Sequence, residues 1–143
     1  MTTRICAITA FAAAVLAWAP PADARDALGL WLTKDRDAKV RVTDCGGSLC
    51  GTIVWLADPI DKETGRPATD KMNPDPSRRN LPMVGVRVFG MQPAGSNKWS
   101  GPIYNADDGK TYSGSVELLD PNTLKIQGCF GPFCDYEIWT RTN

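Results

Sequence analysis

The sequence has no histidine among its 143 residues, and this absence limits the chemistry that the chain can carry out. Without an imidazole, neither a Ser/His nor a Cys/His nucleophile–base pair can be assembled, and the commonest metal ligand is missing. We therefore expect no metal site, no cofactor and no enzymatic activity. Chemistry based on Tyr, Asp or Lys is not excluded by this argument.

The sequence also has no excess charge of either sign, because 16 basic residues balance 16 acidic ones. The densest basic spot is the pair Arg78-Arg79, which is too short to make a basic face. Since nucleic acids are bound largely through contacts from many basic residues to phosphates, we expect no nucleic-acid partner.

Long apolar runs are scarce as well. Residues 5–19 form an uncharged apolar run, which is shorter than the roughly 20 residues that a membrane-spanning helix needs. Arg4 precedes this run and the small-residue cleavage site Ala22-Asp23-Ala24 follows it, which is the pattern of a cleavable signal peptide over residues 1–24. We expect the mature chain, 25–143, to form a single β-barrel domain without a transmembrane segment and to be periplasmic or secreted.

Cysteines are few, and Cys6 is removed with the signal peptide. The other four form two matched units, in which Cys45 and Cys50, and likewise Cys129 and Cys134, enclose a Gly-containing loop between strand-like segments. A hairpin loop of this length places its flanking residues opposite each other, so we expect the disulfides Cys45–Cys50 and Cys129–Cys134. Cross-pairing between the two hairpins and a four-cysteine zinc site are the alternatives.

Most of the mature chain consists of short segments with alternating apolar and polar residues, which is typical of β-strands. Eight such segments are expected, at residues 29–34, 39–44, 51–57, 83–90, 98–105, 111–120, 123–130 and 135–142. Short polar turns such as Asp107-Asp108-Gly109 connect most of them, which favours antiparallel neighbours. The predicted fold class is therefore all-β: an antiparallel, up-and-down, eight-stranded barrel, with a sandwich as the alternative.

The alternation also predicts which side chains point into the barrel. The predicted inward residues are Val40, Val42, Tyr112, Val116 and Leu118. In segment 83–90 the valines, beginning with Val84, follow the same period, and segment 135–142 offers Tyr136 and Ile138 as its apolar residues.

One long connection interrupts this pattern at residues 58–82, which contain five prolines and many charged residues. Loops of this length in compact domains are usually functional or disordered. One interpretation is a loop that covers one mouth of the barrel, where Arg78 or Arg79 holds a carboxylate or another anion. The other is a solvated crossover, in which the arginines pair with Asp70 and Asp75 or face solvent.

Aromatic residues on the strands give the second group of candidates. Some of them are expected to line a pocket that stacks a flat or apolar ligand, and the alternative is ordinary barrel core. The candidate ligand-binding residues from the strands and the loop are Trp55, Asn73, Asp75, Arg78, Arg79, Tyr104 and Tyr112.

Several strings, in order along the mature chain, carry a resemblance to a known family. They are Gly29-Leu-Trp31, the string 49–55, the string 70–78 leading to Pro82 and Gly85, the string 103–114, and Gly128-Cys129 to Trp139. Together they resemble DUF2147, an uncharacterised family of small secreted bacterial proteins. The chain departs from that family's loop pattern by one inserted residue, Met72. The resemblance implies a lipocalin-like β-barrel without an established enzymatic activity, and it implies no particular ligand.

The first of these strings has a further likeness. Gly29-Leu-Trp31 resembles the Gly-x-Trp opening of lipocalins, in which an arginine from the last strand covers the tryptophan. The corresponding residue here is Arg141, and we expect its guanidinium to pack on Trp31 through a cation–π contact.

The function expected from these features is a secreted, periplasmic, lipocalin-like protein that binds a small apolar or amphiphilic molecule. The alternative is a module of the cell envelope with a filled barrel, which binds or inhibits a protein partner.

Overall fold

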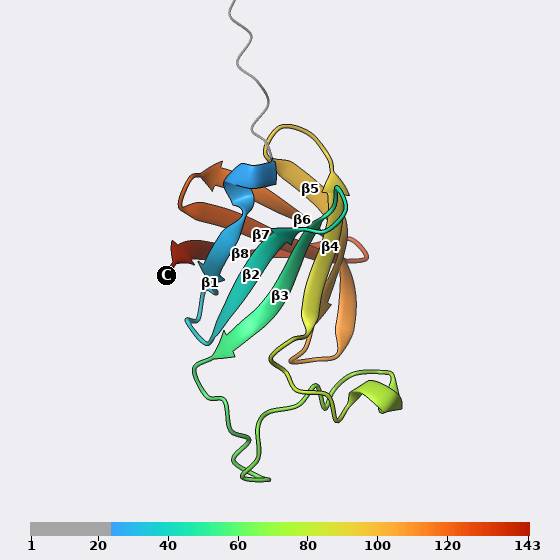
Figure 1. Ribbon diagram of the computed structural model, residues 1–143. Coiled ribbons are helices and arrows are strands. Elements are labelled where there is room, and N and C mark those ends of the chain that lie inside the picture. The colour runs from blue at the N-terminus through green and yellow to red at the C-terminus, as the bar shows by residue number, and fades with distance from the viewer. Residues whose placement is uncertain (1–23) are drawn as a thin grey trace, which may run out of the picture.

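A computed structural model describes residues 24–143, and these form a closed antiparallel β-barrel preceded by a short 3-10 helix (Figure 1). The elements in chain order are η1 (Ala24–Ala27), β1 (Gly29–Leu32), β2 (Ala38–Asp44), β3 (Leu49–Leu56), η2 (Pro76–Arg78), β4 (Arg87–Pro93), β5 (Lys98–Asn105), β6 (Lys110–Asp120), β7 (Thr123–Phe130) and β8 (Phe133–Thr142). Each strand pairs with the next, and β8 returns to pair with β1. The predicted eight-stranded, up-and-down barrel is thus confirmed. The predicted signal peptide, apart from Ala24, lies outside the described residues.

The barrel follows from the alternation of side chains along its strands. On β2, Val40 and Val42 are buried while Arg41 between them is exposed. On β6, Val116 and Leu118 are buried and Leu119 is exposed. The inward positions expected on these strands are therefore confirmed.

The strand β4 begins four residues later than the sequence pattern suggests, at Arg87 instead of Met83. Val84 is exposed and lies outside the strand. The next residue, Gly85, has a φ of 107°, which an L-residue with a side chain rarely adopts and which ends the extended run there. Residues 83–86 therefore belong to the long connection between β3 and β4, residues 57–86, which we call the β3–β4 loop.

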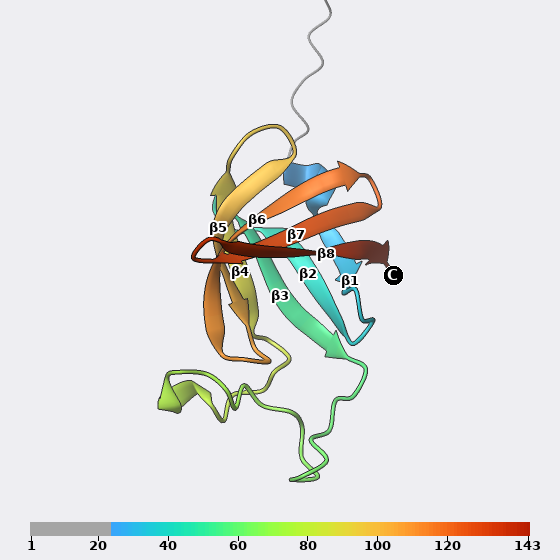
Figure 2. The same cartoon turned by 180° about the vertical axis from the view of Figure 1, so that it is seen from behind.

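The η1 end of the barrel is filled by side chains. Its fully buried members include Trp31, Leu49, Met91, Val116 and Leu124. The Trp31 indole N–H donates to the carbonyl of Ala27 at 2.9 Å, which fixes η1 against this core. Figures 1 and 2 show that η1 lies at one end of the barrel and that the β3–β4 loop lies at the other, which we call the loop end.

Arg141 joins the last strand to the segment before the first. Its guanidinium lies 4.3 Å from the centroid of the Trp31 ring. It also donates to the carbonyls of Asp26, Leu28 and Pro121, each at 2.7 Å. The expected contact between Trp31 and Arg141 is confirmed.

Both expected disulfides, Cys45–Cys50 and Cys129–Cys134, are present. Each closes one hairpin, between β2 and β3 and between β7 and β8 respectively. Among residues 24–143, no helix is both long enough and apolar enough to cross a membrane.

Candidate functional site

The interior of the barrel is hollow toward the loop end, where a cavity of about 670 Å³ lies among inward-facing side chains. Its apolar wall includes Val40, Ile53, Phe89, Ile103, Ile126 and Trp139, which lie on β2, β3, β4, β5, β7 and β8 respectively. Its rim comes from the turn after β1, the β3–β4 loop and the turn after β5. Eight-stranded barrels are either filled by side chains or hold one small ligand, and this one is filled in one half only.

Two aromatic rings form part of the cavity wall. The centroids of Phe89 and Trp139 lie 6.3 Å apart with their planes tilted, a favourable arrangement for aromatic pairs. The Phe89 ring lies against the backbone of Gly51, its partner on the neighbouring strand β3. A Cβ added to Gly51 would lie 2.5 Å from this ring. The glycine therefore makes room for the ring.

The β3–β4 loop is fastened to the barrel by a buried carboxylate. Asp70 is 3% exposed, and it accepts a hydrogen bond from the Tyr104 hydroxyl on β5 at 2.6 Å. It accepts a second from the Asn73 side-chain amide at 2.7 Å. Burial and the hydrogen bond to Asp70 raise the pKa of Tyr104 to about 12, so this phenol stays protonated at neutral pH.

A second contact brings the loop against the turn between β5 and β6. Gly109 in this turn has a φ of 71°, and a Cβ added to it would lie 1.9 Å from the carbonyl oxygen of Met72. Only glycine fits both this backbone conformation and this close approach. Two contacts thus hold the segment from Asp70 to Asn73: one with Tyr104 on β5, and one with Gly109 in the turn between β5 and β6.

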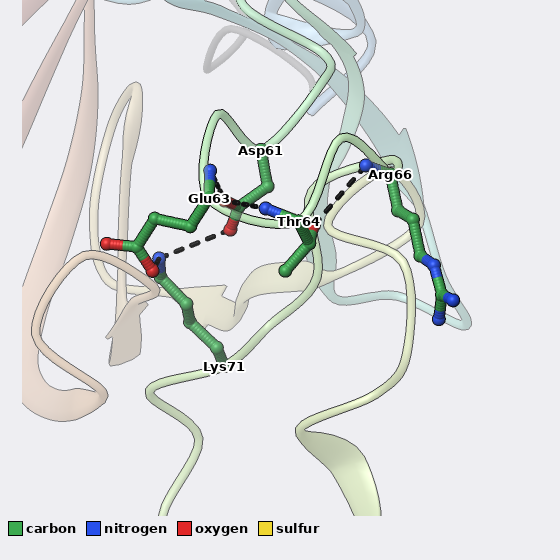
Figure 3. A network of polar contacts seen from close by, with 5 residues as sticks. All are labelled: Asp61, Glu63, Thr64, Arg66 and Lys71. Carbon is green, nitrogen blue, oxygen red and sulfur yellow. Dashed lines mark hydrogen bonds and ion pairs between the residues drawn. The ribbon is translucent and has the colours of Figure 1, made fainter.

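The tip of the loop has its own polar network, shown in Figure 3. The Asp61 carboxylate accepts hydrogen bonds from the backbone N–H groups of Glu63 and Thr64 and forms an ion pair with Lys71 at 3.3 Å. The bond from Glu63, followed by the one from Lys71, lowers the pKa of Asp61. Thr64 in turn accepts from the backbone N–H of Arg66 at 3.3 Å. The loop is therefore an ordered structure held by its own contacts.

Two of the candidate ligand-binding residues, Tyr104 and Tyr112, line the cavity. Each of their hydroxyl groups already donates to a carboxylate, that of Tyr104 to Asp70 and that of Tyr112 to Asp108. The bond to Asp108 raises the pKa of Tyr112. The hydroxyl hydrogens of both residues are thus engaged, and the Tyr112 ring packs against Phe130 with 5.9 Å between the ring centroids.

The four loop candidates are not among the residues that line the cavity, and they make local contacts instead. Asp75 caps η2 by accepting from the N–H of Ser77 at 3.0 Å, and it forms an ion pair with Arg78 at 3.6 Å. Arg79 donates to the carbonyl of Asn73 at 2.8 Å. These contacts fit the interpretation in which the loop residues form turns and local ion pairs, and not the one in which Arg78 or Arg79 holds an anion at the mouth of the barrel. Asp70, expected as an ion partner of the arginines, is bound by Tyr104 and Asn73.

Trp55 also lies away from the cavity, although its strand contributes Ile53 to the wall. In the pairing of β2 with β3, Lys39 is opposite Trp55 and the next residue, Val40, is opposite Ile53. Val54 on β3 therefore has no partner on β2. This β-bulge at Val54 reverses the alternation, so that Trp55 is 42% exposed with the Lys39 ammonium 5.3 Å from its ring centroid. The candidate role of Trp55 in ligand binding therefore does not fit its position.

The inward face of β8 was missed by the sequence pattern, which pointed to Tyr136 and Ile138. The structure places Asp135, Glu137 and Trp139 along the cavity, with the Trp139 indole N–H donating to the Glu137 carboxylate. Tyr136 also lines the cavity, and the residue is 59% exposed. The alternation of the strand could have revealed this face had Trp139 been taken as its anchor.

The charged side chains that line the cavity are predominantly acidic. The carboxylates are those of Asp35, Asp37, Asp58, Asp107, Asp135 and Glu137, and the single basic side chain is that of Lys34. Within the described part of the chain, no three metal-ligating side chains converge.

Both the sequence and the fold are similar to those of known proteins. Residues 29–141 match the model of a family described as "Uncharacterized protein conserved in bacteria (DUF2147)". The structure is similar to that of protein HP1028 from Helicobacter pylori, described as belonging to the lipocalin family. The two chains are 22% identical, the TM-score is 0.68, and the match covers 81% of this chain and 82% of the other. No curated protein matches the sequence.

Proposed function

The chain belongs to the bacterial family DUF2147 and has a lipocalin-like fold, and from this we propose that it binds a small apolar or amphiphilic molecule inside its barrel. The observation that carries the proposal is the cavity of about 670 Å³ at the loop end. Ligand sites in proteins typically have volumes of roughly 300–1,000 Å³ and mainly apolar walls. Burial of apolar ligand surface would contribute roughly 25 cal/mol per Å² before the costs of association.

The β3–β4 loop serves as a fixed rim in this proposal. Asp58, Ala68 and Met83 of the loop line the cavity. The hydrogen bond from Tyr104 to Asp70 holds the middle of the loop at this end of the barrel. A ligand would therefore enter beside a loop that is already in place, and little ordering entropy would be lost on binding.

We place the protein in the periplasm or outside the cell. The predicted signal peptide supports this location, and so do the two disulfides, because such bonds persist in oxidising compartments. The proposed role is binding and not catalysis. The raised pKa values of Tyr104 and Tyr112 keep both hydroxyl groups protonated at neutral pH, and a protonated phenol is neither a general base nor an effective nucleophile.

A protein partner is the second candidate function, and one surface feature favours it. The hairpin between β7 and β8 exposes Phe130 and Phe133, which are 61% and 80% exposed and are paired with each other across the two strands. Exposed aromatic side chains that adjoin each other are typical of interaction sites. The Phe130 ring packs against Tyr112, which lines the cavity, so this surface adjoins the proposed ligand site.

Binding can be tested by titrating a neutral, environment-sensitive naphthylamine fluorophore into the purified protein and displacing it with neutral long-chain alcohols. We expect saturable binding with one site per barrel. A matched pair of variants locates the site: Val88→Trp adds a large ring at a wall position and should abolish binding, whereas Trp55→Ala, outside the cavity, should leave it unchanged. Failure of every apolar probe to bind would contradict the proposal, as would equal effects of the two variants.

A further inference from the structure

We infer that the ligand is a cationic amphiphile, with an apolar body in the barrel and a positively charged group, such as an ammonium, at the mouth. This inference rests on the proposed binding function and specifies the chemical class of its ligand. It reverses the charge preference that the loop arginines suggested from sequence.

The cavity wall carries an excess of negative charge. Six carboxylates line the cavity against one ammonium, that of Lys34, although the sequence as a whole is neutral. Acidic groups thus gather at this site while the basic residues lie elsewhere. Arg36, in the same turn as Lys34, does not line the cavity. A surface of one sign around a low-dielectric opening concentrates molecules of the opposite charge.

Within residues 26–143, these six carboxylates form no ion pair. Among residues 26–143, the ion pairs join Lys71 to Asp61 and Glu63, and Arg78 to Asp75. None of these acidic residues lines the cavity. The negative charge of the lining is therefore available to a ligand.

One of these carboxylates, that of Glu137, is partly buried beside aromatic rings that line the cavity. The Trp139 indole N–H donates to its carboxylate and fixes its position, and the Phe89 ring packs against Trp139. A carboxylate among aromatic faces suits an ammonium group, which gains both an ion pair and cation–π contacts. Its partly apolar surroundings strengthen this attraction relative to water.

The cavity lining offers few hydrogen-bond donors to an anion. Arg78 and Arg79 lie on the outer part of the loop, where they bind Asp75 and the Asn73 carbonyl. The hydroxyl groups of Tyr104 and Tyr112 donate to carboxylates. A ligand carboxylate or sulfate would meet Lys34 and six like charges, and like charges in one site repel.

The test compares three probes that share one decyl chain and differ in the head: decyltrimethylammonium, decanol and decyl sulfate. Isothermal titration calorimetry below the micellar concentrations measures each affinity at low salt and at about 0.5 M salt. We expect the cation to bind at least about fivefold more tightly than the alcohol, and the sulfate more weakly than the alcohol. High salt should reduce this preference and leave the affinity for the alcohol nearly unchanged.

Glu137→Gln removes the interior charge and keeps the shape of the side chain. We expect it to lower the cation-to-alcohol affinity ratio by about fivefold or more, without weakening the binding of the alcohol. Glu117→Gln is the matched control, since Glu117 lies on β6 and does not line the cavity. Should Glu137→Gln impair folding, the double variant Asp58→Asn/Asp107→Asn at the exposed rim replaces it, with the same expected direction.

The outcomes separate the two proposals. If the alcohol binds as tightly as the cation, or the sulfate binds more tightly than either, the inference of a cationic ligand is overturned while the binding function stands. If none of the three probes binds, the binding function fails and this inference fails with it. An unchanged affinity ratio in both the Glu137→Gln and the rim variants would also overturn the inference.

Discussion

The phenol of Tyr104 and the carboxylate of Asp70 form a 2.6 Å hydrogen bond between β5 and the β3–β4 loop. Among residues 26–143, Asp70 is the single buried residue with a charged side chain. Its carboxylate accepts hydrogen bonds from the side chains of Tyr104 and Asn73. A buried carboxylate without partners would be strongly unfavourable, so this bond determines where the loop rests. The position of the loop in turn sets part of the cavity rim, through Asp58, Ala68 and Met83.

Removing the donor should therefore destabilise the protein. Tyr104→Phe leaves Asp70 with Asn73 as its remaining side-chain donor. We expect the free energy of unfolding to fall by about 1–3 kcal/mol, measured by chemical denaturation. Tyr136→Phe, at a residue that is 59% exposed, is the control and should change the stability by much less. Equal losses in the two variants would show that the bond is unimportant.

The same pair predicts a dependence on alkaline pH. Folding raises the pKa of Tyr104 from about 10 to about 12, so the folded state favours the protonated phenol. This contribution to stability is complete below pH 10 and is lost as the pH rises toward 12. In a titration of tyrosinate absorbance, Tyr104 should ionise near pH 12, and Tyr104→Phe should reduce the absorbance change there, while the delayed ionisation of Tyr112 remains. An absorbance change near pH 12 as large in the variant as in the parent protein would contradict the assignment.

Substitution of Arg141 should destabilise the protein strongly at the η1 end of the barrel. It donates to three carbonyl groups and stacks on Trp31, so Arg141→Ala should lower the free energy of unfolding by about 2–4 kcal/mol. Arg141→Lys should recover little, because an ammonium cannot reproduce the planar fork of donors. The control is Arg41→Ala on the exposed face of β2, where a comparable loss would argue against a special role for Arg141.

Gly109 and Gly65 offer a matched test of whether the turn between β5 and β6 holds the β3–β4 loop in place. Their φ angles are 71° and 66°, so a substitution by Ala costs similar backbone strain at both sites. A Cβ at Gly109 would collide with the Met72 carbonyl, whereas nothing lies within 4 Å of one at Gly65. We expect Gly109→Ala to displace the loop and to speed limited proteolysis within residues 57–86, while Gly65→Ala does not. Similar cleavage rates would mean that the turn does not hold the loop.

The features that could be predicted from sequence are those set by local spacing or by a single motif. Val40 and Val42 alternate without interruption, and each cysteine pair spans one hairpin, so the barrel strands and the disulfides were predicted correctly. The contact between Trp31 and Arg141 followed from a resemblance and could not have come from spacing, because the two residues are paired only when the barrel closes.

The features that could not be predicted depend on register or on tertiary contacts. Trp55 turns outward because of a bulge whose existence is decided by the neighbouring strand, and nothing in the local sequence marks it. The loop arginines have suitable chemistry for an anion, but the Asp75 cap and the Asn73 carbonyl engage them locally. On β8, a search for apolar side chains passed over the acidic residues Asp135 and Glu137, which face the cavity.

The contacts of Arg141 have a consequence for the order in which the barrel can assemble. The residues that they join are separated by 113 residues for Leu28 and 115 for Asp26, and the pairing of β1 with β8 joins equally distant segments. Contacts of such long range form slowly, because the intervening chain must first be ordered. The hairpins from β2 to β8 can form as the chain emerges, but the seam between β1 and β8 must wait for Arg141. Until then both edge strands are open to other chains, and this interval is when aggregation through strand pairing is most favoured.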